Sequence, residues 1–596
     1  MKKYSCETLV TYRTMVFCYF CNDLGTVIVE YVLVTVNRQE LNMTKISNLT
    51  LPSLFYNSVK EFSEKTSLVF AGEENYTYSQ LGNDVELLAE MMLELGVRKG
   101  DKVAILSTNM PNWGKTFFAI SLVGAVAVPI LPDFHSREIH TIIEHSESKV
   151  LFVSEGLYST VSDETAELLQ KMVMIDNFAI IQKFTPASHL KLLATSFPLN
   201  VRKYKRVDVD EQDLASIIYT SGTTGNSKGV MLSHKNLVWT AQQSRTLQEI
   251  IPSDRFLSIL PLSHTLENTV GFLLPVMYGA SVHYLRKPPV ASVLLPALAK
   301  VKPTIMLSVP LIIEKVYRSK VQPTFQKNGL MRFASSFAPT RKLLHKIAAK
   351  KVLASFGGQI RFFGIGGAKL DSTVEQFLFE GGFPYAIGYG LTETAPLLAG
   401  AVANNRAVGS TGIAMEGVQL RLGDVDAKTG EGEIQAKGEN VMKGYYKAPD
   451  LTAEVFTEDG WFRTGDRGIF DKKGRLYIKG RIKTMIVGAS GENIYPEEIE
   501  SVINKMRFVL ESLVVEKKGK LVAMIHLNME EVEGNLQHLK EEAKQFVSAK
   551  ADEILQEIHK KVNQEVNKFS KISQVVLHPL PFERTPTKKI KRFLYA

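Results

Sequence analysis

Short, continuous runs of apolar residues recur along the chain from about residue 100, and stretches of helical length separate them. A continuous apolar run is typical of a strand that is covered on both faces of its sheet. Helix-length connections between such strands are typical of β-α-β crossovers. The pattern therefore predicts an α/β fold, with a large domain of mostly parallel sheets flanked by helices. The expected strands are Val103–Leu106, Ala125–Ile130, Val150–Val153, Met172–Ile175, Ser216–Tyr219, Phe256–Leu260, Thr304–Val309 and Ile360–Ile365.

Two later segments depart from this pattern. Lys315–Phe356 is rich in Lys, Arg, Ala and Leu and has no strand-like run, so it predicts a helical excursion on the surface. Between about residues 409 and 480, short strands alternate with glycine turns. That alternation predicts antiparallel meanders, which we expect to form a small β-barrel-like part of the large domain.

A smaller α+β unit is expected after about residue 484. Proline and acidic residues at Pro496 and just after it predict the start of a helix. Leu510–Val515 and Leu521–Leu527 predict strands, and Leu536–Phe569 predicts a long, charged amphipathic helix. This helix could lie on a membrane surface, but its mixture of Glu and Lys favours a solvated face.

The first 42 residues do not show the strand and helix pattern of the rest of the chain. The segment from Leu9 to Val36 is apolar and aromatic, but charged residues interrupt it at Arg13, Asp23 and Glu30. A bilayer span needs about 20 mostly apolar residues, and charges inside it are costly. No clean signal-peptide pattern is present either. Two interpretations stay open, a weakly membrane-associating extension and an upstream mis-start before Met43, and we favour the second.

Net charge and cysteine content exclude some classes of partner and of stabilising framework. A formal net charge of +9 suits polyphosphates, nucleic acid or an anionic membrane face. The sequence contains none of the nucleic-acid-binding motifs, so we expect a diffuse positive surface and no nucleic-acid partner. The three cysteines, Cys6, Cys18 and Cys21, all lie in the first 21 residues. A disulfide framework in the core is therefore excluded.

The most informative stretch is residues 219–229, Tyr-Thr-Ser-Gly-Thr-Thr-Gly-Asn-Ser-Lys-Gly, directly after a predicted strand. Its glycines let backbone N–H groups approach phosphate oxygens, its hydroxyls add donors, and its lysine adds positive charge. The spacing differs from a Walker A loop, because no Lys-Ser/Thr pair follows the last glycine of the loop. The expected phosphate-binding residues are Thr220, Ser221, Gly222, Thr223, Thr224, Gly225 and Lys228.

This loop resembles the signature of the adenylate-forming superfamily, which includes acyl-CoA synthetases, luciferases and peptide-synthetase adenylation domains. The resemblance continues in the same order from about residue 60 to the C-terminus, and residues 388–394, Gly-Tyr-Gly-Leu-Thr-Glu-Thr, carry it most specifically. It implies that Tyr389, between Gly388 and Gly390, stacks on adenine and that Thr392 bonds the α-phosphate. It also implies that Glu393, with Thr220, holds Mg²⁺. The turn implied to line the adenine pocket is Gly366, Gly367 and Ala368.

Further roles follow from the same resemblance. Asp466, at the end of a Gly-Trp-Phe-Arg-Thr-Gly-Asp motif, would accept both ribose hydroxyls, and Arg481 would contact the nucleotide. Lys483 matches the hinge between a large domain, residues 43–482, and a small mobile domain, residues 483–596. The family rotates this small domain between its two half-reactions. Gly491 would belong to the loop presented to the pantetheine arm of the thiol substrate.

The C-terminal run Thr585–Arg592 resembles the catalytic-lysine motif. Lys589 takes the place of that lysine, whose ammonium would bridge the substrate carboxylate and the α-phosphate. The alternative is a basic tail that serves solubility or membrane contact. His264, in Pro-Leu-Ser-His, resembles the segment beside the acyl pocket and would position substrate or thiol. Val270–Leu274 and Ile305–Leu311 are expected to supply apolar walls for an acyl tunnel.

Within the superfamily the likeness is closest to long-chain fatty acyl-CoA synthetases, through the helical insertion, Val309–Tyr317 and the Thr-Pro-Thr-Lys tail. It implies a cytoplasmic ligase that uses ATP, Mg²⁺ and coenzyme A to activate a fatty acid, and peripheral membrane contact is compatible with its charge. Acyl carrier protein is the alternative thiol. A non-catalytic nucleotide- or acyl-binding protein, an amino-acid adenylation module and an oxygen-dependent luciferase remain rival functions. The oligomeric state stays open.

Overall fold

The computed structural model describes residues 15–21, 27–33, 46, 48–73, 75–182, 204–220, 227–326, 329–402, 405–487, 493–517, 519–533, 542–585 and 590–595. Its contacts divide the chain into two compact units, Met1–Ser47 and Asn48–Ala596. In the first unit, β1 (Met15–Cys21) pairs antiparallel with β2 (Val27–Leu33). The boundary at residues 42 and 43 and the hinge at Lys483 remain predictions.

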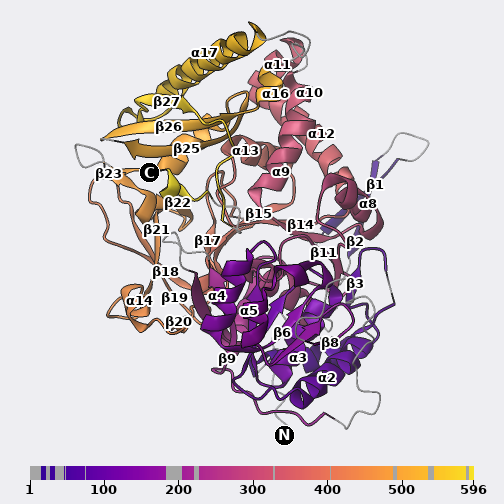
Figure 1. Ribbon diagram of the computed structural model, residues 1–596. Helices are drawn as coiled ribbons and strands as arrows, with labels where there is room; N and C mark the ends of the chain where they lie inside the picture. The colour runs from indigo at the N-terminus through magenta and orange to yellow at the C-terminus, as the bar shows by residue number, and fades with distance from the viewer. Residues whose placement is uncertain are drawn as a thin grey trace. The chain divides into compact units, whose positions relative to one another are not determined.

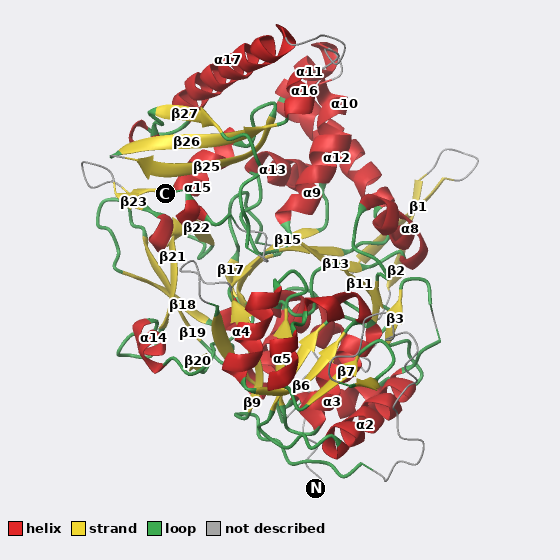
Figure 2. Ribbon diagram, in the orientation of Figure 1, coloured by secondary structure: helices red, strands yellow, loops and turns green. Residues whose placement is uncertain are grey.

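In the described part of the second unit, strands gather mainly into two large mixed sheets flanked by helices (Figures 1 and 2). In the first, β5, β4, β6 and β7 are parallel, and β5 is buried along its whole length, as its apolar sequence predicts. In spatial order its strands are β20 (Gly444–Tyr445), β10 (Lys228–Ser233), β9 (Leu214–Thr220), β5 (Val126–Ile130), β4 (Lys102–Leu106), β6 (Ser148–Val153), β7 (Lys171–Met174) and β8 (Ala179–Ile181).

The second large sheet is parallel from β3 to β15 and antiparallel beyond it. Because parallel neighbours point the same way, the residues that follow β13, β14 and β15 lie at one edge of this sheet. In spatial order its strands are β17 (Ile413–Ala414), β16 (Leu397–Ala401), β15 (Tyr385–Gly390), β14 (Phe362–Ile365), β13 (Ile305–Ser308), β11 (Arg255–Ser258), β12 (Ser281–Tyr284) and β3 (Leu68–Phe70).

The helices of the large domain begin and end at recognisable signals. The helix from Tyr78 opens with a capping box, in which Thr77 and Gln80 bond each other's backbone N–H groups. The helix from Ser372 is capped by Asp371 and ends at Gly382, whose φ of 68° suits glycine. The helices are α1 (Leu51–Glu61), α2 (Tyr78–Glu94), α3 (Pro111–Leu122), α4 (Ser136–Ser146), α5 (Asp163–Leu168), α6 (His234–Ser244), α7 (Leu274–Met277), α8 (Ala291–Val301), α13 (Ser372–Gly381) and α14 (Pro449–Glu454).

The predicted helical excursion is confirmed and lies between β13 and β14. Its outer helix is anchored where Arg341 donates two hydrogen bonds to the buried Glu380 of α13, at 3.0 and 2.8 Å. Despite the excursion, β13 and β14 stay in register, with Ile305 opposite Phe362 and Ser308 opposite Ile365. Its elements are α9 (Pro310–Val316), the π-helical turn η5 (Tyr317–Val321), α10 (Gln322–Gln326), α11 (Gly329–Ser336) and α12 (Ala338–Ser355).

The predicted meanders form an antiparallel sheet of strand order β18 (Gln419–Gly423), β19 (Gly432–Lys437), β21 (Phe462–Phe470) and β22 (Leu476–Arg481). The C-terminal part has its own hydrophobic core, which includes Ile499, Ile525 and Val562. Its short pair β23 (Ile486–Val487) and β24 (Asn493–Ile494) precedes the elements that enclose this core. Those elements are α15 (Pro496–Ile503), β25 (Val509–Lys517), β26 (Lys520–Leu527), α16 (Met529–Glu533), α17 (Glu542–Glu565) and β27 (Gln574–Leu577).

The predicted α/β class, the helical excursion and the α+β C-terminal part are thus confirmed. The long C-terminal helix is confirmed from Glu542 to Glu565, and it ends before the predicted Phe569. Residues 534–541 lie outside the described ranges. None of the helices in the described ranges combines the length and the apolarity that crossing a bilayer requires.

Candidate active site

The predicted phosphate loop closes an antiparallel hairpin. Thr220, the last residue of β9, lies opposite Lys228, the first residue of β10. The Nζ atom of Lys228 lies 4.8 Å from the centre of the Tyr445 ring, at the end of β20. This places the mouth of the loop beside β20. The predicted loop residues that lie outside the described ranges are Ser221, Gly222, Thr223, Thr224 and Gly225.

The turn after β15 carries Thr392 and Glu393, within a short 3-10 helix, η6 (Thr392–Thr394). The Tyr445 hydroxyl donates a hydrogen bond of 2.9 Å to Oε1 of Glu393. Burial, together with the Glu393 charge, raises the pKa of Tyr445, so the hydroxyl keeps its proton and remains a donor. Tyr445 therefore joins the predicted metal ligand to the base of the phosphate loop.

Tyr389, Asp466 and Arg481 meet although they come from β15, β21 and β22. The buried Tyr389 hydroxyl donates to Oδ2 of Asp466 at 2.8 Å, and Nε of Arg481 lies 2.7 Å from Oδ1 of the same carboxylate. Asp466 and Arg481 are opposite each other in the register of β21 and β22. Burial, together with Asp466, raises the pKa of Tyr389. The structure thus brings together the residues predicted to contact adenine and ribose.

The predicted glycines cluster at the shared edge of β14 and β15. Gly366, Gly367 and Ala368 follow β14, and Gly388 and Gly390 belong to β15. A Cβ atom at Gly390 would lie 1.7 Å from the carbonyl oxygen of the nearby Pro396, so this position requires glycine. Gly367 has a φ of +86°, which also favours glycine.

An apolar cavity of about 50 Å³ adjoins this edge. Gly366 and Gly388 both line it, so the cavity and the predicted adenine turn share residues. Small-molecule sites usually enclose roughly 300–1,000 Å³, so an acyl chain would have to push the lining side chains apart to enter this cavity. The lining residues that come from the predicted walls are Val270, Leu274, Ile305 and Leu307.

His264 lies beside the cavity. Its Nδ1 accepts a hydrogen bond of 3.3 Å from the backbone N–H of Leu266, which lines the cavity. A π-helical turn, η4 (Glu267–Leu273), follows directly. Burial raises the pKa of Glu267 to about 8, so this carboxyl group is protonated near neutral pH.

Lys483 lies exposed in the short helix η7 (Ile482–Thr484), directly after β22. The neighbouring Thr484 hydroxyl donates to Oε1 of Glu497 in α15 at 2.8 Å, and a guanidinium nitrogen of Arg592 lies 3.5 Å from the same oxygen. Arg592, near the C-terminus, therefore meets α15 close to the predicted hinge. Gly491 and Lys589, the other residues predicted for the small domain, lie outside the described ranges.

Comparison with known proteins shows the family to which the chain belongs. The family model described as AMP-binding enzyme matches residues 55–446. The chain belongs to the AMP-binding enzyme family. A long-chain-fatty-acid–CoA ligase of Mycobacterium bovis is 30% identical over 87% of this chain and 90% of its own length. A chloroplastic long-chain-fatty-acid–[acyl-carrier-protein] ligase of Arabidopsis thaliana is 28% identical over 91% of this chain and 84% of its own.

Solved structures agree with the family fold. An o-succinylbenzoate coenzyme A synthetase of Bacillus subtilis, in complex with ATP and magnesium ion, superposes with a TM-score of 0.69. It is 23% identical, and the match covers 91% of this chain and 98% of that one. The resemblance to the adenylate-forming superfamily that the motifs predicted is confirmed, as is the fold.

Sequence reasoning missed two parts of this family site. Tyr445 was not predicted, although it stands in a Gly-Tyr-Tyr run that follows Lys443 and could have drawn attention. Leu247 and Ile250, which follow α6 and line the cavity, were missed as well. Among the residues that the structure describes, no group of three or more His, Cys, Asp or Glu side chains could hold a metal ion.

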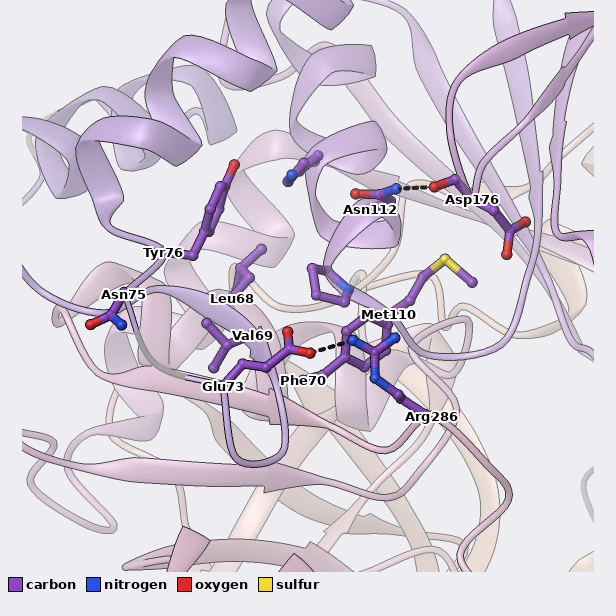
Figure 3. Close-up of a pocket in the computed structure, with 12 residues that line it drawn as sticks. Leu68, Val69, Phe70, Glu73, Asn75, Tyr76, Met110, Asn112, Asp176 and Arg286 are labelled. Carbon is purple, nitrogen blue, oxygen red and sulfur yellow. Dashed lines mark hydrogen bonds and ion pairs between the residues drawn. The ribbon is translucent and has the colours of Figure 1, made fainter. Parts of the chain in front are cut away.

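A second pocket lies between β3 and the start of α3 (Figure 3). Glu73 forms an ion pair with Arg286 on its wall, and the Asn112 amide donates to the backbone carbonyl of Asp176 at 3.0 Å. The residues predicted for the nucleotide and acyl sites do not line this pocket. It is therefore separate from the site built at the edge of β14 and β15.

Proposed function

We propose that the protein activates a long-chain fatty acid with ATP and transfers the acyl group to coenzyme A. The observation that carries the proposal is that Gly366 and Gly388 line the apolar cavity at the same sheet edge as the nucleotide residues. An apolar chain in the cavity would then present its carboxylate to the nucleotide at that edge. The names of the Mycobacterium bovis and Arabidopsis thaliana relatives support a long-chain acid.

The nucleotide contacts follow the predicted roles. The loop from Thr220 to Lys228 holds the β- and γ-phosphates of ATP, as its glycines, hydroxyls and lysine suit. The turn at residues 366–368 and Tyr389 hold adenine, and Asp466 holds the ribose hydroxyls, with Arg481 beside it.

Glu393 fits a Mg²⁺ ion that accompanies the nucleotide. Magnesium ions in proteins usually take one or two carboxylates together with phosphate oxygens and water. The Tyr445 hydrogen bond holds the Glu393 carboxylate in place, as partners of metal ligands generally do. Bound there with Thr220, the ion supplies positive charge to the phosphate oxygens.

The first step forms the acyl-adenylate. A carboxylate oxygen of the fatty acid attacks the α-phosphorus of ATP, and the bond to the pyrophosphate oxygen breaks. Thr392 donates to the α-phosphate, and the Lys589 ammonium offsets the charge that the two anions bring together. His264 positions the acyl head. Most of the rate enhancement comes from positioning and charge stabilisation.

The second step transfers the acyl group. The small domain turns about Lys483, and the loop of Gly491 meets the pantetheine arm. The thiol sulfur attacks the acyl carbonyl carbon, the bond to the AMP oxygen breaks, and the thiol proton leaves to solvent. Coenzyme A is the proposed thiol. Acyl carrier protein is the second candidate, because the Arabidopsis thaliana relative is named for that acceptor.

Pyrophosphate release, measured with fatty acids of graded chain length in the presence and absence of coenzyme A, tests the function. We expect release that rises with chain length, AMP as a product, and turnover that depends on the thiol. Substituting acyl carrier protein for coenzyme A distinguishes the two acceptors. Failure of every acid to yield AMP from ATP would exclude the proposed activity.

Lys589→Ala tests the catalytic lysine, and Lys588→Ala is its matched control. We expect Lys589→Ala to abolish pyrophosphate release while ATP still binds, because the phosphate loop and the Asp466 pair remain intact. Lys588→Ala should retain release. The opposite result would move the role to Lys588, and near-normal release in both variants would refute a lysine in this step.

A further inference from the structure

The positive charge of the protein is concentrated in the helical excursion between β13 and β14. The chain has 71 basic and 62 acidic residues, a formal net charge of +9. Residues 310–355 alone contain ten Lys and Arg residues and a single acid, Glu314. This short segment therefore carries as much net charge as the whole chain.

The outer face of α12 combines that charge with apolar side chains. His345, Ala349 and Val352 form the inner face of the helix and are buried. Leu343 and Ile347, one helical turn apart on the opposite face, are 59% and 51% exposed. A row of lysines, Lys342, Lys346 and Lys350, runs along one side of these residues and is exposed as well.

Two aromatic rings extend the exposed apolar area at the junction of α11 and α12. Phe333 is 63% exposed and Phe337 is 52% exposed, and their ring centres lie 4.9 Å apart. Large exposed apolar side chains that gather in this way mark an interaction surface. We call this set the basic helical surface, which comprises Lys315, Arg318, Lys320, Arg332, Phe333, Phe337, Lys342, Leu343, Lys346, Ile347, Lys350 and Lys351.

We propose that the basic helical surface docks the protein on a lipid bilayer that carries anionic headgroups. Lysine and arginine attract such a surface, and phenylalanine, leucine and isoleucine enter its outer layer, as in interfacial amphipathic helices. An acidic protein partner would use the charge, but it would leave the exposed apolar side chains without a matching environment. The composition therefore favours the bilayer.

The position of the surface connects docking with the acyl cavity. Ile305 and Leu307 of β13, and Phe362 and Ile365 at the ends of β14, line the cavity, and the excursion is the segment that joins these two strands. A bilayer bound to the excursion holds the protein next to a reservoir of fatty acid. This last step depends on the proposed function, whereas docking itself does not.

Flotation of the full-length protein with vesicles tests docking. We expect binding to vesicles of phosphatidylcholine with phosphatidylserine, weak binding to phosphatidylcholine alone, and loss of binding as salt rises. Each basic residue near an anionic membrane contributes roughly fivefold in affinity. The variant Lys342→Gln/Lys346→Gln/Lys350→Gln should therefore bind on the order of a hundredfold more weakly.

The matched control, Lys428→Gln/Lys472→Gln/Lys473→Gln, makes the same charge change at exposed positions in the turns of the meander sheet. It should bind as the native protein does. Phe333→Ser/Phe337→Ser should weaken vesicle binding without changing its dependence on salt. Equal losses in the two lysine variants, equal binding to neutral and anionic vesicles, or binding to an acidic carrier protein but to no vesicle would each overturn the proposal.

An activity measurement separates docking from catalysis. With detergent-dispersed fatty acid, the three variants should turn over as the native protein does. With fatty acid embedded in anionic vesicles, the variant at Lys342, Lys346 and Lys350 should be slower. Vesicle binding without any ligase activity would refute the proposed function and leave docking standing.

Discussion

Tyr445→Phe isolates the hydrogen bond that links the phosphate loop to the predicted metal ligand. The substitution removes the hydroxyl that donates to Glu393 at 2.9 Å and keeps the ring that packs against Lys228. Hydrogen bonds to charged groups contribute about 1.5–3 kcal/mol, and about 1.4 kcal/mol changes an equilibrium tenfold. We therefore expect the apparent affinity for Mg²⁺ to fall by about tenfold to a hundredfold.

The assay is pyrophosphate release at saturating fatty acid and coenzyme A, with Mg²⁺ titrated at fixed ATP. Tyr446→Phe is the matched control, because the neighbouring hydroxyl donates to Glu147 at 3.4 Å instead of to a predicted site residue. It should leave the magnesium dependence unchanged. Binding of the nucleotide without Mg²⁺ should persist in both variants, since Tyr389 and Asp466 are untouched.

The same magnesium dependence in the native protein and Tyr445→Phe would refute the reasoning. Glu393 would then be oriented by other contacts in the working enzyme. Loss of nucleotide binding without Mg²⁺ would also count against it, because the substitution would have disturbed the fold of the site and not the Glu393 carboxylate alone.

Three further substitutions test other features. Gly390→Ala should abolish pyrophosphate release and lower the melting midpoint, because its Cβ would collide with the carbonyl of Pro396; a native-like midpoint would contradict this packing. Lys483→Pro should block thioester formation more than adenylate formation, and equal loss in the two half-reaction assays would count against the hinge. Glu267→Gln should raise the melting midpoint near pH 7 but not near pH 4.5. The Glu267 carboxyl group has a pKa of about 4.5 in the unfolded chain and about 8 in the folded protein, so near pH 7 folding must take up a proton. This lowers the free energy of unfolding by about 3 kcal/mol near pH 7, and the loss grows as pH rises. Glu458→Gln, at an exposed position, is the control, and a difference in midpoint that does not grow with pH would contradict the buried-acid interpretation.

Much of the fold could be predicted because buried segments are apolar, and that pattern is visible in the sequence. Ala125–Ile130 is apolar throughout since both faces of β5 are covered, and the lack of such runs in Lys315–Phe356 reflects its helices. Strand order could not be predicted in this way. Nothing in the sequence of β20 indicates that it pairs with β10, more than two hundred residues earlier.

The residues of the candidate site likewise fall into those that a local motif indicates and those that only the folded structure shows. Glu393, Tyr389 and Asp466 stand in motifs that resemble those of the adenylate-forming superfamily, so the resemblance named them before their positions were known. Tyr445 acts through long-range pairing of two short strands, and no local motif shows that contact. The roles given to Lys589 and Gly491 stay predictions, because both residues lie outside the described ranges.

The register of β13 and β14 makes the excursion between them separable from the rest of the enzyme. Its ends are already brought together by the sheet, and the entropy of closing such a loop grows by only about 0.6 kcal/mol for each doubling of its length. A change in the length of the excursion therefore costs little loop-closure entropy, provided that the contact of Arg341 with the buried Glu380 of α13 is kept. In the proposals made above, docking and catalysis thus depend on different segments of the chain.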